Sequence, residues 1–432
     1  MEIVEVRKDV RLLKVGMYVC RLDRPWLDTP YEMEGFLIQS DEDLQELAKH
    51  CSYVFIDDRR SVYAGQRKRM DFGFLAPLGK PHAIARLERF GFRQMRGLDR
   101  PPVYPVEYAE SIELAKELPR AANAWKKART MVSQIIARAK VGKPFDPEEV
   151  MDSVEYVVDS VVRSPDATMW LSTIHRQANY VISHPLNCCA LVLVFARYLG
   201  FPPEILLSMA KGALLMDIGM WRLNQNFYIN RNALDEASLE EVHEHVVRGL
   251  DYLESCGFLD VDARLMILHH HERYDDAGYP RQVRGAKVSL MGYMLGLADA
   301  FDAICSRRSY RDEGTILDAQ RELLKQRDLA FPGELVEAFL QCLGVYPTGS
   351  FVELSTGEIA AVSGQQVDSR LYPRLILLTN ADRSTRSEFV EVDSRKLVTA
   401  DPPVKIVRSV LRSSVKVPLD RIELMNREET EA

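Results

Sequence analysis

The central part of the chain shows one helical pattern after another and no strand pattern. Between Asp146 and Leu323 apolar residues recur three and four positions apart, the spacing that gives an amphipathic helix one buried face. The predicted helices span residues 146–164, 178–199, 203–215, 238–255, 260–271, 289–306 and 316–323. Because such helices bury their apolar faces against one another, the sequence predicts an all-α domain over residues 146–345.

A mixed pattern precedes this helical part. Strands are predicted on both sides of Gly16 within residues 10–20, at residues 35–39 and at residues 52–57. A helix is predicted over residues 41–51, with Ser40 or Asp41 as its N-cap. The pattern indicates a small α+β N-terminal domain over residues 1–65. The next segment is rich in Arg, Gly and Pro, so residues 66–145 are interpreted as a linker and helical connector.

Strand patterns return toward the C-terminus. Two β runs flank Thr356 and Gly357, which is typical of a hairpin, and further strands are predicted at residues 373–380 and 387–393. These patterns indicate a β-rich C-terminal extension over residues 346–432. The predicted architecture is therefore multidomain, with a small α+β domain, an all-α core and a short β-rich appendage.

Composition excludes some classes of function. The formal net charge of -7 gives no support to nucleic-acid binding, which usually requires a basic excess, although a small anion could still bind in a local basic pocket. The apolar run from Cys188 to Ala196 is too short to span a bilayer and is interpreted as part of a buried helix. The seven cysteines are scattered without a CxxC motif. We therefore expect a reduced, cytoplasmic protein without a membrane partner.

The histidines are concentrated in the helical part. Seven of the nine histidines, all except His50 and His82, fall between His175 and His271. Asp299 and Asp302 are three residues apart and share one helix face. A lone histidine is usually an ordinary core or surface residue. Several imidazoles and carboxylates on facing helices, however, are costly to bury unless they are paired or bind metal. Such a set suits Fe, Mn, Ni or Zn, and two metals held this way could direct hydroxide at a phosphodiester.

The order of several motifs resembles the HD-GYP family. The stretch HHHERYDDAGYP, from His269 to Pro280, resembles the family signature HHExxDGxGYP, and ADAFDAICSRRSYR resembles its ADxxDAxxxxRxYR/K segment. Residues 245–249 resemble its HPxxG motif with Val246 in place of Pro, and His184 matches the first histidine of its helical core. The segment LKVGMYVCRLDRPWLDTPYEMEGFLI also resembles the small domain of unknown function that often precedes HD-GYP domains.

The resemblance implies cyclic di-GMP or a related nucleotide as ligand and a divalent metal, Fe, Mn or another, as cofactor. It implies these metal ligands: His184, Asp217, His245, His270, His271 and Asp299. Asp217 would bridge two metals and be the catalytic carboxylate. It implies these ligand-binding residues: Gly278, Tyr279, Pro280, Arg308 and Arg311. The arginines would bind ligand phosphates.

The sequence departs from the family at its central signature. The motif HDIGK reads MDIGM here, so Met216 replaces a metal-binding histidine and Met220 replaces a lysine. A thioether is a weak ligand for hard divalent metals, and Met220 has no proton to donate. Tyr180 stands where some members offer a glutamate for a third metal, and Asp276 replaces a glycine of the signature. The metal would be held at reduced occupancy.

Three functions stay open on this evidence. We favour a degenerate HD-GYP protein of cyclic di-GMP signalling that binds a ligand or a partner with weak or no phosphodiesterase activity. An active, metal-dependent cyclic di-GMP phosphodiesterase with an unusual metal site is the alternative, and a docking protein without the ligand is the third. The resemblance also implies two protein partners to test: a diguanylate cyclase-type (GGDEF) protein and a second copy of the chain in a homodimer.

Overall fold

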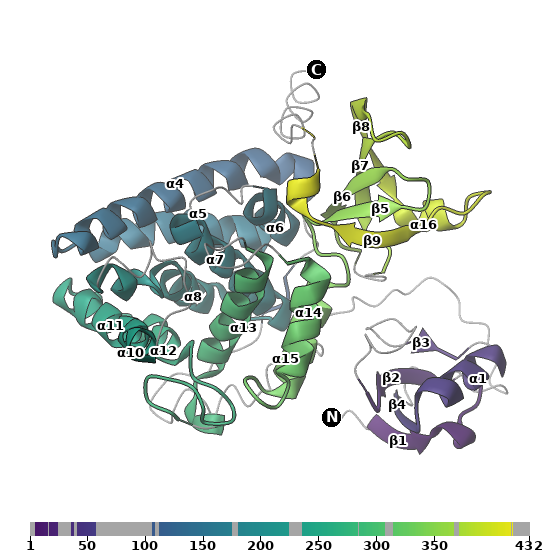
Figure 1. The fold of residues 1–432 in the computed structure, drawn as a ribbon, viewed down its shortest axis with the longest axis horizontal. Coiled ribbons are helices and arrows are strands. Elements are labelled where there is room, and N and C mark those ends of the chain that lie inside the picture. Colours follow the sequence, from purple (N-terminus) through teal and green to yellow (C-terminus); the bar gives the residue numbers. More distant parts are fainter. Residues whose placement is uncertain are drawn as a thin grey trace. The chain divides into compact units, whose positions relative to one another are not determined.

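The computed structural model describes residues 5–15, 17–24, 36–38, 41–57, 106–108, 112–174, 180–223, 236–283, 285–306, 314–366, 371–415 and 417. They form two units (Figure 1): the described residues up to Asp57 form one, and the elements from α4 onward form the other. Most of the predicted linker and the predicted N-cap Ser40 lie outside the described residues. The four predicted domain bounds stay predictions.

The first unit is a small antiparallel sheet with one helix. It contains β1 (Glu5–Asp9), β2 (Tyr18–Leu22), β3 (Phe36–Leu37), α1 (Asp41–His50) and β4 (Tyr53–Asp57). The strand order is β1-β4-β2-β3. Apolar residues from α1 and the strands, including Leu47, Val19 and Ile56, form its core.

The prediction of a strand between Val10 and Gly16 is wrong. The strand lies earlier, in β1, and Val10–Leu12 form a short 3-10 turn, η1. The Asp9 carboxylate accepts a hydrogen bond from the backbone N–H of Arg11 at 2.9 Å, which caps this turn and ends the strand.

The second unit contains the predicted all-α domain, and the long helix α4 comes directly before that domain in the chain. Its helices are α4 (Leu114–Lys140), α5 (Pro147–Arg163), α6 (Pro165–Ile174), α7 (Tyr180–Leu199), α8 (Pro203–Leu215), η3 (Ile218–Arg222), α10 (Glu236–His243), α11 (His245–Ser255), α12 (Val261–His269), η4 (Gly285–Lys287), α13 (Leu290–Cys305), α14 (Ile316–Lys325) and α15 (Gly333–Leu343). The sequence did not predict α6 or α15, and the helix predicted over residues 238–255 divides at Glu244.

The centre of this domain is α7. It packs against α6, α8 and α13, and the apolar run from Cys188 to Ala196 is buried throughout, as predicted. Among the helices that the structure describes, α7 alone is long and apolar enough to cross a membrane, but 78% of its apolar window is buried inside the protein. Such burial is that of a core helix.

The predicted C-terminal appendage is a five-stranded antiparallel sheet in the order β8-β7-β6-β5-β9. Its elements are β5 (Phe351–Leu354), β6 (Ile359–Gly364), β7 (Arg374–Thr379), β8 (Thr385–Asp393), α16 (Ser394–Val398), β9 (Ile406–Val410) and η5 (Arg412–Ser414). Gly357, with φ of +92°, makes the predicted turn between β5 and β6. The edge strand β9 was not predicted. The sheet contacts α6, where Asp166 accepts a hydrogen bond from Thr348 at 2.6 Å.

Candidate metal centre

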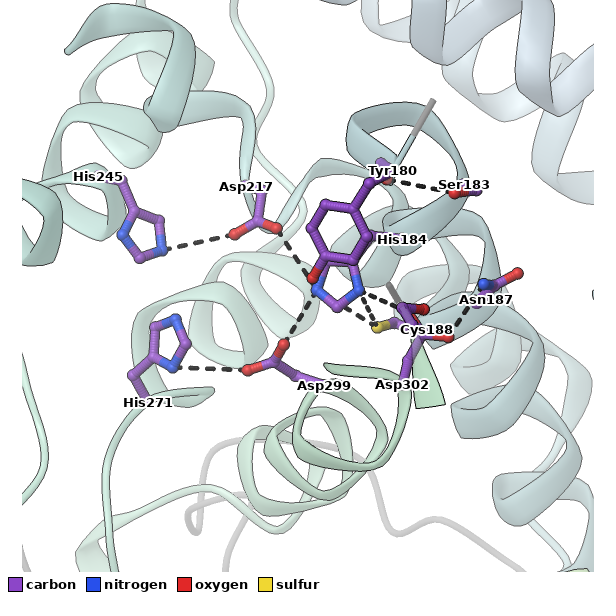
Figure 2. Close-up of polar contacts among 11 residues, drawn as sticks. Tyr180, Ser183, His184, Asn187, Cys188, Asp217, His245, His271, Asp299 and Asp302 are labelled. Atoms are coloured by element: carbon purple, nitrogen blue, oxygen red, sulfur yellow. Dashed lines mark hydrogen bonds and ion pairs between the residues drawn. The ribbon is translucent and has the colours of Figure 1, made fainter. Parts of the chain in front are cut away.

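The predicted metal ligands gather at one cavity of the helical domain, and Figure 2 labels all of them except His270. They are His184 on α7, Asp217 in the turn after α8, His245 at the start of α11, His270 and His271 at the end of α12, and Asp299 on α13. All except His270 line the cavity, and His270 lies beside His271. Residues more than a hundred positions apart therefore face one another because five helical segments meet here.

Two glycines allow these segments to approach closely. A Cβ atom on Gly219 would lie 1.8 Å from the carbonyl oxygen of His245, so only glycine lets η3 pack against α11 and bring Asp217 to the histidine. A Cβ atom on Gly278 would lie 2.4 Å from the backbone nitrogen of Arg273. This loop carries Tyr279 back to the cavity, and its compactness depends on the missing side chain.

Four residues form what we call the histidine cluster: Asp217, His245, His270 and His271. One ligand atom from each lies within 4.8 Å of the others. Nδ1 of His245 is 2.7 Å from the carbonyl oxygen of Val242, and Nδ1 of His270 is 2.6 Å from that of Ile267. Because a carbonyl only accepts, each Nδ1 carries the proton and each Nε2 has a free electron pair.

The two Nε2 atoms are buried without a hydrogen-bond partner. The carboxylate oxygen of Asp217 nearest to His245 is 3.5 Å away, beyond the usual hydrogen-bond range. Backbone carbonyls that fix the tautomer of a histidine are the usual support of a metal-binding imidazole. The orphaned nitrogens, with the Asp217 carboxylate facing them, therefore fit a divalent metal.

Burial disfavours the charged form of two imidazoles in this cluster. Burial lowers the pKa of His270 and, more strongly, that of His271, and the neighbouring imidazoles add to the effect. Neutral imidazoles are the form that binds metal. No proton has to be lost from these two rings before they coordinate.

The opposite side of the cavity is different. We call its three residues, His184, Asp299 and Asp302, the carboxylate cluster. Nδ1 of His184 is 2.7 Å from Oδ2 of Asp302, and Nε2 is 2.9 Å from Oδ1 of Asp299. Both ring nitrogens therefore face carboxylates, which only accept when ionised, so both nitrogens donate and the ring is an imidazolium.

The surroundings stabilise this charge. Burial alone would lower the pKa of His184, but Cys188, Tyr180 and the two carboxylates outweigh burial and raise the pKa well above its ordinary value. Burial also opposes ionisation of Asp299, yet the hydrogen bond from His184 lowers the pKa of that carboxyl well below its usual range. Asp302 accepts further hydrogen bonds from Asn187 at 2.9 Å and Ser306 at 3.1 Å.

The two clusters meet at shared carboxylates. Asp217 lies 3.8 Å from Nε2 of His184 through its other oxygen, and Oδ2 of Asp299 lies 3.7 Å from Nδ1 of His271 (Figure 2). The positively charged ring of His184 consequently lies beside Asp217 and Asp299, the two carboxylates that face the place where a metal would bind.

The two methionines of the altered signature lie differently. Met216 is fully buried and is not among the residues that line the cavity. Met220, on η3, does line it. The chain therefore offers no nitrogen at position 216 and no proton donor at position 220.

The predicted ligand-binding residues fall into two groups. The ring of Tyr279 is stacked between those of His243, with centroids 3.8 Å apart, and His271, at 4.6 Å. Tyr279 lines the cavity, whereas Gly278 and Pro280 shape its loop. Arg308 and Arg311 lie outside the described residues. Asp276, in place of the signature glycine, keeps a positive φ of +64°, so the backbone conformation typical of glycine persists there.

Sequence reasoning missed some of the site. Asp302 was noted only for its spacing from Asp299, and that shared helix face was the available indication that it orients His184. Val132, Ile135 and Ile136 of α4 also line the cavity, and no motif pointed to them.

Comparison with known proteins agrees with this geometry. Residues 169–335 match the family model of the HD domain, and residues 6–150 match that of a domain of unknown function, DUF3391. The chain is 27% identical to a cyclic di-GMP phosphodiesterase of Pseudomonas aeruginosa over 377 residues, 87% of this chain and 85% of that protein.

Two further relatives match a shorter segment. A cyclic di-GMP phosphodiesterase response regulator of Xanthomonas campestris is 31% identical over 34% of this chain, and a 3'3'-cGAMP-specific phosphodiesterase of Vibrio cholerae is 30% identical over 29%. The matches span 39% and 24% of those proteins, less than half of their length.

Proposed function

Since the chain belongs to the HD domain family and is of the HD-GYP type, we propose that it is a degenerate member that binds cyclic di-GMP or a related nucleotide and hydrolyses it weakly or not at all. The relatives named above supply the ligand class. The reduced activity is inferred from the site itself.

The observation that carries the proposal is the close contact of both ring nitrogens of His184 with carboxylates. In the carboxylate cluster both nitrogens of this ring are engaged by Asp299 and Asp302, while the imidazole expected at position 216 is a buried thioether. A metal on this side would have to displace a proton held by two carboxylates and would gain no ligand from Met216.

The histidine cluster keeps its donors. We propose that Asp217, His245, His270 and His271 hold one divalent ion, with Fe or Mn suited to this nitrogen and oxygen set. When bound, such an ion would supply Lewis acidity and a water of lowered pKa. Met220 cannot protonate the leaving oxygen, and loss of a general acid commonly costs ~10²–10⁴ in rate.

The intact histidine cluster also favours a second candidate, an active phosphodiesterase that works with one metal. Both candidates bind the nucleotide, and they differ in turnover. Two protein partners, a GGDEF protein and a second copy of the chain, rest on the family resemblance alone. The cytoplasmic location stays a prediction.

The test compares binding with hydrolysis in one preparation. The full chain is supplied with Mn²⁺ or Fe²⁺, its metal content is measured, and cyclic di-GMP is added. We expect binding in calorimetry, at most one ion per chain, and little linear dinucleotide product by chromatography. Substantial turnover would support the one-metal enzyme. Absence of nucleotide binding would leave only the docking protein.

A further inference from the structure

The three imidazoles of the histidine cluster are not held in the same way. The Nδ1 atoms of His245 and His270 each donate to a backbone carbonyl, which fixes the orientation of both rings. In the part of the chain that the structure describes, the ring of His271 has no such bond. Its Nδ1 lies 3.7 Å from Oδ2 of Asp299, beyond the usual hydrogen-bond range. The orientation of this third imidazole must therefore have another cause.

Aromatic rings pack against His271 instead. The ring centroid of His270 lies 4.0 Å away, and the ring of Tyr279 is stacked at 4.6 Å with 29° between the planes. His245 makes an edge contact at 5.1 Å and 81°. Stacked and edge-to-face pairs of this kind are attractive and have a preferred geometry. Of these three neighbours, Tyr279 is the one that is not itself a predicted metal ligand.

The loop that carries Tyr279 is fixed to the end of α12. The backbone N–H of Tyr279 donates to the carbonyl oxygen of His271 at 3.2 Å. The buried carboxylate of Glu272 accepts hydrogen bonds from the backbone N–H groups of Arg281 at 2.6 Å and Val283 at 3.0 Å. These bonds fix the backbone of the loop, whereas the direction of the Tyr279 ring depends on the contacts of its own side chain.

The second contact of that ring is with His243, the last residue of α10. The two ring centroids are 3.8 Å apart, with 14° between the planes, a closer and more parallel pair than Tyr279 and His271. His270 is buried and His243 is partly exposed, so the series of rings ends near the surface. His243 lies two positions before the motif that begins at His245, outside every segment that resembles the family.

We propose that His243 is a positioning residue: it holds Tyr279 against His271 and thereby sets the direction of the third imidazole of the histidine cluster. This proposal rests on the proposed function, because it assigns the support of a metal ligand proposed there. His243 is not among the residues that line the cavity, so it acts through Tyr279. Ring packing does for His271 what a backbone carbonyl does for His245 and His270.

The first test removes the outer ring. The full chain, as wild type and as H243A, is titrated with Mn²⁺ alone, and the free ion is followed by paramagnetic resonance. The affinity should fall about tenfold, the lower end of the loss expected when a group that supports a metal ligand is removed. H243F keeps a flat ring without nitrogens and should restore most of the affinity. H243N has no ring and should behave like H243A, which keeps the test open if the alanine variant does not fold.

A matched control separates positioning from a loss of stability. Met131 is buried on α4 and is not among the residues that line the cavity, so M131A should lower thermal stability without changing the affinity for Mn²⁺. H243A changes a partly exposed side chain, so it should lower stability less and weaken metal binding more. An equal loss of affinity in M131A and H243A, or a failure of H243F to restore it, would overturn the proposal.

A double-mutant cycle tests whether His243 acts through Tyr279. Y279A should weaken Mn²⁺ binding at least as much as H243A, and adding H243A to Y279A should cause no further loss, because residues in contact are not additive. Additive losses would overturn the proposal. If the wild type binds Mn²⁺ and H243A binds it equally well, the positioning role fails alone. If the wild type binds no Mn²⁺, the proposed metal site fails and the positioning role fails with it.

Discussion

The two sides of one cavity have opposite protonation states. In the histidine cluster, backbone carbonyls hold the Nδ1 protons of His245 and His270, and the free Nε2 pairs face inward. In the carboxylate cluster, His184 donates through both nitrogens and carries a positive charge. One side is arranged to accept a cation, and the other already contains one.

On the proposed function, the difference explains how one half of a metal site could be lost while the fold stays intact. Asp302 is fully buried, and Asp299 is largely so. Two carboxylates in such a place are costly unless a cation neutralises them. The proton on His184 supplies that charge without any ion. The remaining residues, His184, Asp299 and Asp302, form a hydrogen-bonded network without a nitrogen from position 216.

Restoring both methionines to the family residues should remove the difference between the two sides and have the largest effect. Met216→His returns an imidazole beside Asp217, and Met220→Lys returns a proton donor to the cavity. We expect metal content to rise and hydrolysis of cyclic di-GMP to increase by ~10²–10⁴. Each single change should do less, because ligand and acid act on one step.

The control for this variant is M216L/M220L, which keeps both positions apolar and should leave metal content and rate unchanged. If the restored variant gains neither metal nor rate, the carboxylate cluster does not open when an imidazole is offered, and the proposed loss of activity has further causes, with Tyr180 and Asp276 the next residues to change.

Breaking the carboxylate cluster should mainly reduce stability. Asp302→Asn removes the anion at Nδ1 of His184 and leaves a buried charge less compensated. The free energy of unfolding of the metal-free protein should fall by about 3–5 kcal/mol, the usual cost of breaking a buried pair, as measured by urea denaturation. Glu254→Gln, which neutralises an exposed partner of Arg264, is the control and should cost at most ~1 kcal/mol. Equal losses would mean that the network around His184 is not a stabilising element.

The sequence predicted the positions of this network but not its state. The resemblance to the HD-GYP motifs implied His184, Asp217 and Asp299, because a motif fixes which residues a helix carries into a cavity. The charge on His184 depends on Asp302 approaching from another helix, α13, where its carboxylate also accepts a hydrogen bond from Asn187, and no local pattern encodes that distance. The cavity-lining residues of α4, Val132, Ile135 and Ile136, escaped prediction for the same reason, since apolar residues at helical spacing look alike wherever they pack. The strand before Gly16 was misplaced because the Asp9 cap overrides the apolar pattern after it.

Removing single imidazoles tests whether the two sides differ in metal binding. His270→Ala deletes an orphaned nitrogen of the histidine cluster and should weaken metal binding at least ~100-fold, more than the loss of an outer partner costs. His269→Ala is the matched control, because this neighbouring ring instead accepts a hydrogen bond from the backbone N–H of Ser289 at 3.1 Å. His184→Ala should change the affinity far less than His270→Ala. A reversed order would place the ion at the carboxylate cluster. Titration with Mn²⁺ followed by paramagnetic resonance measures all three.

The smallest expected effect is a difference in pH dependence. The pKa of His184 is raised on folding, so its stabilising contribution is complete below the unfolded value of about 6.5 and is lost as pH rises toward the folded value. The pKa values of His270 and His271 are lowered, so their contribution is lost as pH falls below about 6.5 toward their folded values. In the metal-free protein the unfolding free energy should therefore decline on both sides of that pH, by about 1.4 kcal/mol per pH unit for each group that titrates.

His184→Gln should remove the decline on the alkaline side and keep the one on the acid side, and His271→Gln should reduce only the acid one. Denaturant titrations between pH 5 and 9 distinguish these cases, and an alkaline decline that survives His184→Gln would show that the proton is not on this ring.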